Sequence, residues 1–451
     1  WFNYTTSSRV ELLKNQETHT VGADEYDSQL SPASLYAGTI ADQIKSLSPY
    51  SKVVSIAFDP LSAVLMGGYR GDVAYWVNHR EGHFVTNNYY KPGLANWVKS
   101  FNQEERAKAY CKKPWALSKS EGLYKNIYRS AGSMVDSTTS SSALRTLASR
   151  KWSYDDLKVS PYANTLISDF AIESIINEGL GQDDHTDLLN VVYDPSRYIG
   201  EKYGTQSIEV EDCFYKMDME IATLIDYLSI HVGRESLLVV ITSDHGASEP
   251  IIEGSKMPSG KFNAKQFSVL VNGFVGAKLG GDQRWVLDFI DNQVYLDRRL
   301  INQKGHDLEE IQNDVAAFAV QFSGVAQAFT ATSLQQGHFS SGVMGQAQNS
   351  YFQRHSGDVI LNLLPGWIVD DADKLSDSGT AYNYDTHVPL IFWGGMVTNQ
   401  DVLRAVDLTD VASTIAYIVG CAAPNATTGS PIMEVYKQST NRNTVDEESV
   451  D

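Results

Sequence analysis

The chain has 451 residues, with 55 aspartate and glutamate residues against 36 lysine and arginine residues, so its formal charge is 36 − 55 = −19. This acidic balance excludes a broad nucleic-acid-binding surface, which needs a basic face. Hydrophobic residues make up 42% of the chain and charged residues 20%, which is the composition of an ordinary globular protein. No apolar run reaches the roughly 18 residues of a membrane-spanning helix.

Short apolar runs bounded by turn residues predict the buried strands of an α/β sheet. They lie at 53–58, 189–193, 237–242, 267–271, 359–363 and 388–393. Apolar residues at helical spacing predict helices at 169–179, 208–227 and 308–322. Residues 189–242 therefore run strand, helix, strand, which predicts a unit of a mainly parallel sheet flanked by helices.

The order of these elements predicts how the chain is divided. Residues 1–253 and 346–437 are expected to form an α/β core in two parts, interrupted by a capping insertion at 254–345 and followed by an acidic tail at 438–451. Insertions of that size at the carboxyl end of a strand usually cap an active site.

The ends of the chain and its cysteines carry less information. The sequence opens with Trp1 and not with methionine, and we expect it to be incomplete at its start. Cys111, Cys213 and Cys421 lie far apart, which fits neither a zinc knuckle nor a dense disulfide framework but leaves one disulfide open.

The sharpest local signal is a buried strand that ends in Asp244-His245-Gly246. It puts a carboxylate and an imidazole at the carboxyl edge of a sheet, where open α/β folds bind ligands. Oxygen and nitrogen donors on a rigid strand end suit zinc. The alternative is a turn aspartate that caps the next segment beside a structural histidine.

A second signal is His387, which comes just before the apolar run at 388–393. It could face the same crevice as Asp244 and His245, although a lone histidine more often has a structural role. Its value as a metal ligand therefore depends on the first signal.

Taken together, these two motifs resemble those of the alkaline phosphatase superfamily, in its bacterial phosphate-irrepressible branch. The resemblance runs from residue 1 to about 437. Its segments are Trp1-Phe2-Asn3, Arg9-Val10, Ser31-Pro32, Thr39-Ile40, Ala74-Tyr75-Trp76, Phe84-Val85-Thr86, Tyr89-Tyr90, Trp97-Val98, 160–165, 209–212, 242–247, Ser356-Gly357-Asp358, Pro365-Gly366-Trp367 and 384–390.

For that family the resemblance implies an alkaline-phosphatase-like fold, two zinc ions in the crevice, a threonine or serine nucleophile and hydrolysis of phosphate monoesters. Paired cations stabilise the attacking and leaving oxygens of such a displacement. Asp244, His245 and His387 match three zinc-ligand positions. The family's nucleophile, its first metal-binding aspartate and the first strand of its sheet belong to a segment that would precede Trp1.

Other positions depart from the pattern of the family. Its Asp-x-x-x-His ligand pair falls on Arg197 and Glu201, and a guanidinium cannot ligate a cation. Glu201 could still be a ligand, with Asp194 nearby in a rearranged site. Alternatively, Arg197 could take the place of a metal ion and balance the charge of Asp244 near His387. At most one zinc ion, or none, is therefore expected.

The family's charge-stabilising Lys-Asp-Arg triplet aligns with Asp59-Pro60-Leu61. An anion and an apolar group thus replace two cations, which disfavours a phosphate dianion. We expect a catalytically degenerate protein of the periplasm or outer cell surface, acting as a binding or scaffolding subunit. The alternatives are an active zinc-dependent phosphomonoesterase or phosphodiesterase, and a one-metal transferase or binder of a phosphorylated ligand.

The resemblance also has a consequence for folding. A parallel sheet without one of its central strands would leave backbone groups unpaired. We therefore expect another polypeptide segment, the N-terminal part of the same gene product, to pack against this chain and to complete the sheet. An active phosphatase would need the same segment for its nucleophile.

Overall fold

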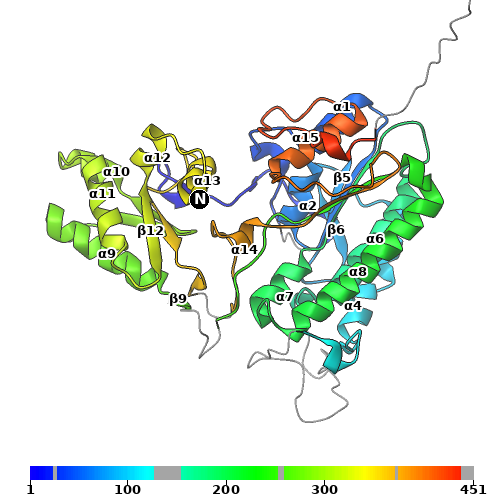
Figure 1. The fold of residues 1–451 in the computed structure, drawn as a ribbon, viewed down its shortest axis with the longest axis horizontal. Helices are drawn as coiled ribbons and strands as arrows, with labels where there is room; N and C mark the ends of the chain where they lie inside the picture. The colour runs from blue at the N-terminus through cyan, green and yellow to red at the C-terminus, as the bar shows by residue number, and fades with distance from the viewer. Residues whose placement is uncertain (24–27, 126–153, 252–258, 371–373, 438–451) are drawn as a thin grey trace, which may run out of the picture.

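The computed structural model describes residues 1–23, 28–125, 154–251, 259–370 and 374–437, and the predicted acidic tail at 438–451 lies outside them. These residues form two lobes: a core lobe around a five-stranded sheet and a second lobe that contains residues 260–369 (Figure 1). None of the described helices is long and apolar enough to cross a membrane.

The core lobe confirms the α/β prediction, with a mixed sheet in place of a mainly parallel one. Its strand order is β3-β6-β5-β4-β7, in which β4 is parallel to β5 and β7, and β6 is antiparallel to β5 and β3. The strands are β3 (Thr20–Val21), β4 (Val53–Ala57), β5 (Val73–Val77), β6 (Phe84–Asn87) and β7 (Leu188–Val192).

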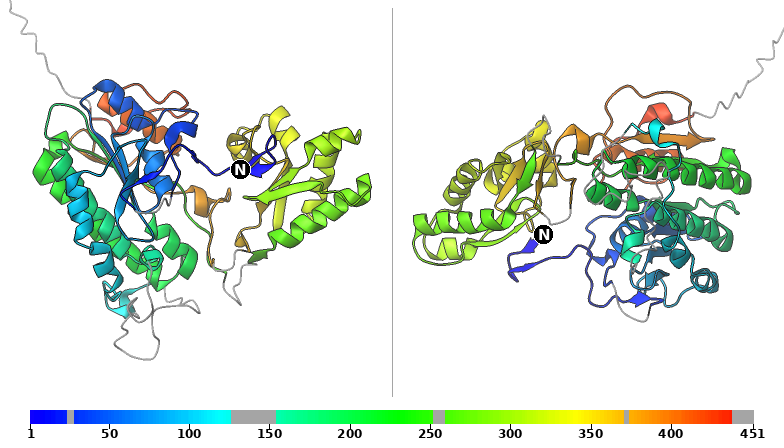
Figure 2. Two further views of the ribbon diagram at one scale, coloured as in Figure 1. Left: turned by 180° about the vertical axis from the view of Figure 1, so that it is seen from behind. Right: turned by 90° about the horizontal axis from the view of Figure 1, so that it is seen from below.

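Helices cover both faces of this sheet, as Figures 1 and 2 show. Side chains alternate between the faces along each strand: Ile56 and Tyr75 pack in the cluster that contains Phe170, whereas Ala57 and Trp76 pack in a second cluster with α2. The helices of this lobe are α1 (Ile40–Leu47), α2 (Pro60–Gly67), α3 (Asn96–Gln103), α4 (Arg106–Cys111), α5 (Tyr154–Leu157), α6 (Tyr162–Glu178), α7 (Pro195–Tyr203), α8 (Ile208–Leu228) and α15 (Thr409–Val419).

Two further strands of the core lobe form a sheet of their own. These strands, β8 (Leu238–Thr242) and β15 (Leu390–Gly394), pair antiparallel, with Leu390 opposite Thr242. The predicted strand, helix and strand at 189–242 are therefore present, but within the part of the chain that the structure describes β8 does not pair with β7, which pairs only with β4. One parallel sheet through both strands was expected, and this part of the prediction is wrong for the described residues.

The second lobe has an antiparallel sheet of order β10-β11-β13-β12 and a parallel pair, β9 with β14. The strands are β9 (Gly260–Phe262), β10 (Val286–Ile290), β11 (Gln293–Leu296), β12 (Val325–Thr330), β13 (Val359–Leu363) and β14 (Trp367–Val369). The helices are α9 (Ala264–Leu279), α10 (Arg298–Gln303), α11 (Leu308–Ala319), α12 (Ala331–Gln336) and α13 (Gly342–Ser350). Because β13 and β14 pair with strands from within 254–345, this lobe continues beyond residue 345.

The strand predicted at 267–271 is wrong, because these residues lie inside α9. Asn263 caps the helix by accepting a hydrogen bond from the backbone N–H of Gln266. Phe267, Val271 and Val275 then recur every four residues on one buried face. A short apolar run fits a strand or a buried helix equally well. Here the spacing of four residues between the buried side chains, which is that of a helix, continues past the run to Val275.

The N-terminal hairpin of β1 (Phe2–Asn3) and β2 (Ser8–Arg9) packs on the second lobe and not on the core sheet. The Tyr4 hydroxyl donates to Asp358 at 2.8 Å, and Arg9 pairs with Asp288 at 2.7 Å. The chain therefore begins between the lobes (Figure 1). All three cysteines are free thiols, so the disulfide left open by the sequence does not form.

Candidate functional site

Three carboxylates follow three strands of the core lobe directly. Asp59 comes after β4, Asp194 after β7 and Asp244 after β8. The carboxyl edge of the strands is where open α/β folds bind ligands, so this edge is the candidate site.

Asp194 holds the ends of β4 and β7 together. Its two oxygens accept the backbone N–H groups of Phe58 at 3.0 Å and Asp59 at 2.7 Å. Burial raises the pKa of its carboxyl group to about 7, with a smaller contribution from the charge of Asp59, although the two N–H donors oppose the shift. Asp194 is therefore engaged by backbone groups, in a structural role that the sequence did not indicate.

Asp59 caps helix α2. Its Oδ1 accepts the backbone N–H of Leu61 at 2.9 Å, its Oδ2 accepts the Tyr198 hydroxyl at 2.5 Å, and Pro60 takes the first position of the helix, where no N–H is needed. Burial and the nearby Asp59 carboxylate raise the pKa of Tyr198. The Asp59-Pro60-Leu61 triplet thus begins a helix and presents no cation to the crevice.

Arg197 and Glu201 pair with each other one turn apart on α7, with Arg197 Nε 2.9 Å from Glu201 Oε1. Lys374 Nζ lies 3.2 Å from the same Glu201 oxygen and 3.2 Å from Asp377 Oδ1. The backbone N–H of Leu375 also donates to the Glu201 carbonyl oxygen, at 2.8 Å. Two cationic side chains therefore hold the carboxylate that was considered as a metal ligand, and the charge partner of Arg197 is Glu201 and not Asp244.

Sequence reasoning missed Lys374. It lies 173 residues after Glu201 in the chain, and no local motif marks it. Only the fold brings the two together.

The Lys374 ammonium is expected to contribute more to stability than the Arg197 guanidinium, although both pair with Glu201. Lys374 bridges two carboxylates with its side chain 25% exposed, whereas the Arg197 side chain is 51% exposed and makes a helix-surface pair. We expect Lys374→Met to lower the free energy of unfolding by about 1–3 kcal/mol and Arg197→Met by about 0.5 kcal/mol. Urea unfolding of both variants measures this difference, and equal losses would contradict it.

Asp244 and His245 remain side by side after β8. Asp244 Oδ2 lies 3.6 Å from His245 Nε2, and His245 Nδ1 lies 2.7 Å from the Gly246 carbonyl oxygen. The Asp244 side chain is 86% exposed. Since the backbone N–H of Gly246 donates to the Asp385 carbonyl oxygen at 2.7 Å, the loops that carry Asp244 and His387 are hydrogen-bonded neighbours.

His387 is exposed at the end of α14 (Asn383–Thr386), in the segment that joins the lobes. Across the described ranges, no three His, Cys, Asp or Glu side chains gather in an arrangement that could hold a metal ion. With Glu201 paired to Arg197 and Lys374, the residues on this edge do not fit a two-zinc centre.

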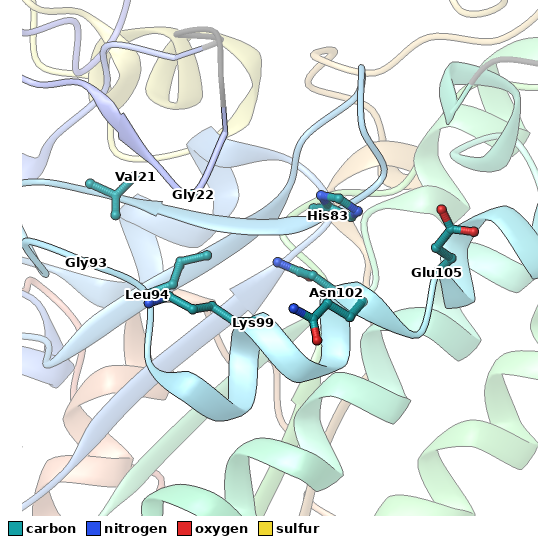
Figure 3. Close-up of a pocket in the computed structure, with 9 residues that line it drawn as sticks. Val21, Gly22, His83, Gly93, Leu94, Lys99, Asn102 and Glu105 are labelled. Atoms are coloured by element: carbon teal, nitrogen blue, oxygen red, sulfur yellow. The ribbon is translucent and has the colours of Figure 1, made fainter.

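A separate cavity of about 660 Å³ lies between the end of β3 and α3 (Figure 3). Its lining includes His83, Leu94, Lys99, Asn102 and Glu105. The Asn102 side chain binds the backbone of β6: it accepts a hydrogen bond from the Phe84 N–H and donates one to the Phe84 carbonyl oxygen, both at 2.9 Å. The cavity contains none of the residues that the sequence singled out.

Comparison with known proteins agrees with the geometry of the fold. A family model described as type I phosphodiesterase / nucleotide pyrophosphatase matches residues 61–388. A protein of Myroides odoratus named calcium-transporting ATPase is 30% identical over 96% of this chain and 81% of its own length. Alkaline phosphatase PhoV of Synechococcus elongatus is 26% identical over 97% of this chain and 80% of its own length.

Among solved structures, that of alkaline phosphatase PafA superposes with a TM-score of 0.88 at 24% identity. The match covers 97% of this chain and 85% of that one. At this identity the likeness shows the fold, and it places the two lobes described above in an alkaline-phosphatase-like arrangement.

Proposed function

The chain belongs to the alkaline phosphatase superfamily, in its PafA-like branch, and from this membership we propose that it is a catalytically degenerate member. In this proposal it acts as a binding or scaffolding subunit of the cell envelope, in the periplasm or at the outer surface. Alkaline phosphatases bind a phosphate ester and transfer its phosphoryl group, and they need cations at the site for that step.

The observation that carries the proposal is the pairing of Glu201 with Arg197 and Lys374. The Arg197 guanidinium and the Lys374 ammonium repel a divalent metal ion. They also pair with Glu201 Oε1, the oxygen that would ligate such an ion. The Asp59 carboxylate adds a negative charge where the family has lysine. An anionic ester would therefore meet repulsion from Asp59 without the metal ions that normally offset it.

The alternative is an active zinc-dependent phosphomonoesterase or phosphodiesterase that is completed by a segment outside this chain. Asp244, His245 and His387 favour it, since all three are exposed or partly exposed and lie on neighbouring loops. In such an enzyme zinc would supply charge stabilisation, and these three side chains would contribute to its ligands.

We expect the purified gene product to hold less than one zinc ion per chain and to hydrolyse neither p-nitrophenyl phosphate nor bis-p-nitrophenyl phosphate above background. Elemental analysis and a colorimetric assay measure the two quantities. Two tightly bound zinc ions together with turnover would instead support the alternative.

A matched pair of variants sharpens this experiment. The double variant Arg197→Asp with Glu201→His restores the ligand types of the family at these two positions, whereas Arg197→Lys keeps the positive charge. Zinc binding should increase in the double variant and remain unchanged in Arg197→Lys. If neither variant differs from the parent, Arg197 is not what excludes the metal.

A further inference from the structure

The second lobe contains a long stretch of sequence without formal charge. Residues 315–353, which run from α11 through β12 and α12 to just beyond α13, contain no aspartate, glutamate, lysine or arginine. Charged residues make up 20% of the chain, so about eight would be expected in a stretch of this length. The stretch contains seven glutamines instead. A surface built from it therefore lacks the charges that mark the rest of this acidic protein.

Helices α12 and α13 are joined through Gln348. Its amide nitrogen donates to the carbonyl oxygens of Leu334 at 2.6 Å and Gly337 at 2.8 Å. Its amide oxygen accepts the backbone N–H of Phe339 at 3.0 Å. Because both polar atoms of Gln348 are bound, this side chain fixes the backbone from which the exposed side chains of the two helices project.

The side chains that this pair of helices exposes are polar, and apart from His338 none of them is ionisable. Three are serines, and five end in an amide: Gln335, Gln336, Gln346, Asn349 and Gln353. None of the large apolar side chains between residues 331 and 353, a range that the structure describes throughout, is exposed. Protein interfaces usually have a core of apolar and aromatic side chains, so these helices do not have the composition of a protein-docking surface.

Two exposed aromatic rings border the amide groups. Tyr36, from the core lobe, is 72% exposed, and its ring centroid lies 5.6 Å from that of Phe352. Trp1 is 37% exposed, and its ring centroid lies 6.0 Å from that of the same Phe352. Figure 1 shows the start of the chain beside α12 and α13. Both residues thus present ring surface to solvent next to the uncharged helices.

Hydrogen bonds connect the amides to this aromatic border. Gln353 Nε2 donates to Gln335 Oε1 at 3.5 Å, and Gln335 Nε2 donates to the Tyr351 hydroxyl at 2.6 Å. Tyr351 directly precedes Phe352, which contacts both exposed rings. These residues form one continuous surface, the amide–aromatic face, made of Trp1, Tyr36, Gln335, Tyr351, Phe352 and Gln353.

We propose that the amide–aromatic face binds a neutral carbohydrate chain. An amide group donates and accepts hydrogen bonds, as a sugar hydroxyl group does. Tyrosine and tryptophan offer rigid apolar ring surface, which suits the C–H face of a sugar ring. A chain of net charge −19 repels acidic molecules, whereas a neutral ligand meets no such repulsion. The face is separate from the strand ends of the core lobe, so the inference holds whether that edge is degenerate or active.

Isothermal titration calorimetry of the purified gene product with neutral hexasaccharides of glucose, mannose, galactose and N-acetylglucosamine tests this proposal. We expect at least one of the four to bind. Tyr36→Ala should weaken that binding about 10-fold because it removes the most exposed ring, and Tyr36→Phe, which keeps the ring, should stay within about 2-fold of the parent. Gln353→Ala removes an exposed amide and should weaken binding about 5-fold.

Failure of the folded protein to bind any of the four sugars would overturn the proposal, as would equal binding by Tyr36→Ala and Tyr36→Phe. Urea unfolding of each variant checks that the fold is intact, and the exposure of Tyr36 predicts parental stability for both of its variants.

Other occupants of the face give different results. Arg354 is exposed and is the first charged residue after the stretch. Binding that is lost in Arg354→Gln and in about 0.5 M sodium chloride would mean an anionic ligand. A mass that rises with protein concentration and stays monomeric in Tyr36→Ala, in place of sugar binding, would mean a second copy of the chain. Either result overturns the proposal.

Discussion

Replacing Asp358 with alanine is expected to lower the free energy of unfolding by about 3–5 kcal/mol, which is the usual cost of breaking a buried ion pair. The Asp358 side chain is fully buried. It accepts hydrogen bonds from Tyr4, Arg298, Gln312 and the backbone N–H of Leu296 at 2.8–2.9 Å. The variant removes the carboxylate that pairs with the Arg298 guanidinium, and burial of Arg298 disfavours its positive charge.

Because Tyr4 belongs to the N-terminal hairpin, the same variant should also loosen the attachment of residues 1–10 to the second lobe. Urea unfolding measures the loss of stability, and limited proteolysis followed by mass spectrometry measures the release of the hairpin. Asp288→Ala is the control, since it removes a pair whose Arg9 side chain is 66% exposed and should cost at most about 1 kcal/mol. Equal losses in the two variants would contradict the role assigned to Asp358.

The stability of the protein is expected to fall between about pH 4 and pH 7 because of Asp194. Its carboxyl pKa is raised from 3.8 to about 7 in the folded state, so the folded state holds a proton that the unfolded state has released. The contribution of Asp194 to the free energy of unfolding is therefore fully present below about pH 4, and it is lost as the pH rises through about 7. A pKa raised from 3.8 to about 7 corresponds to a change of up to about 4 kcal/mol in the free energy of unfolding.

The measurement is the difference in unfolding free energy between the parent and Asp194→Asn across this range of pH. Asparagine does not titrate, so the parent should lose stability relative to the variant as the pH rises. Asp244→Asn, which removes a carboxylate that is 86% exposed at the end of β8, is the control for the substitution itself. A difference for Asp194→Asn that does not change with pH would contradict the raised pKa of Asp194.

Local sequence patterns predicted most of the core lobe. The apolar runs at 53–58 and 189–193 and the amphipathic stretch at 208–227 appear as β4, β7 and α8, since buried strands and long periodic helices have the clearest signals. The strand predicted at 267–271 was wrong because a run of five residues, four of them apolar, fits the period of a strand and that of a helix. Val275, which continues the buried face of Phe267 and Val271, decided for a helix. Pairing of β8 with β15 could not be predicted, because register between strands 150 residues apart has no local signal.

For the candidate site, too, the sequence predicted some features and the fold decided others. The sequence by itself determined which residue types stand at the strand ends, and thus that position 197 carries a cation and position 59 an anion. Only the tertiary structure decided their partners. Lys374 pairs with Glu201 from 173 residues away in the chain, and Asp194 accepts hydrogen bonds from the backbone N–H groups that follow β4. The physical reason is that charge and period are local properties of a chain, whereas ion pairs, burial and strand pairing depend on distances that only folding sets.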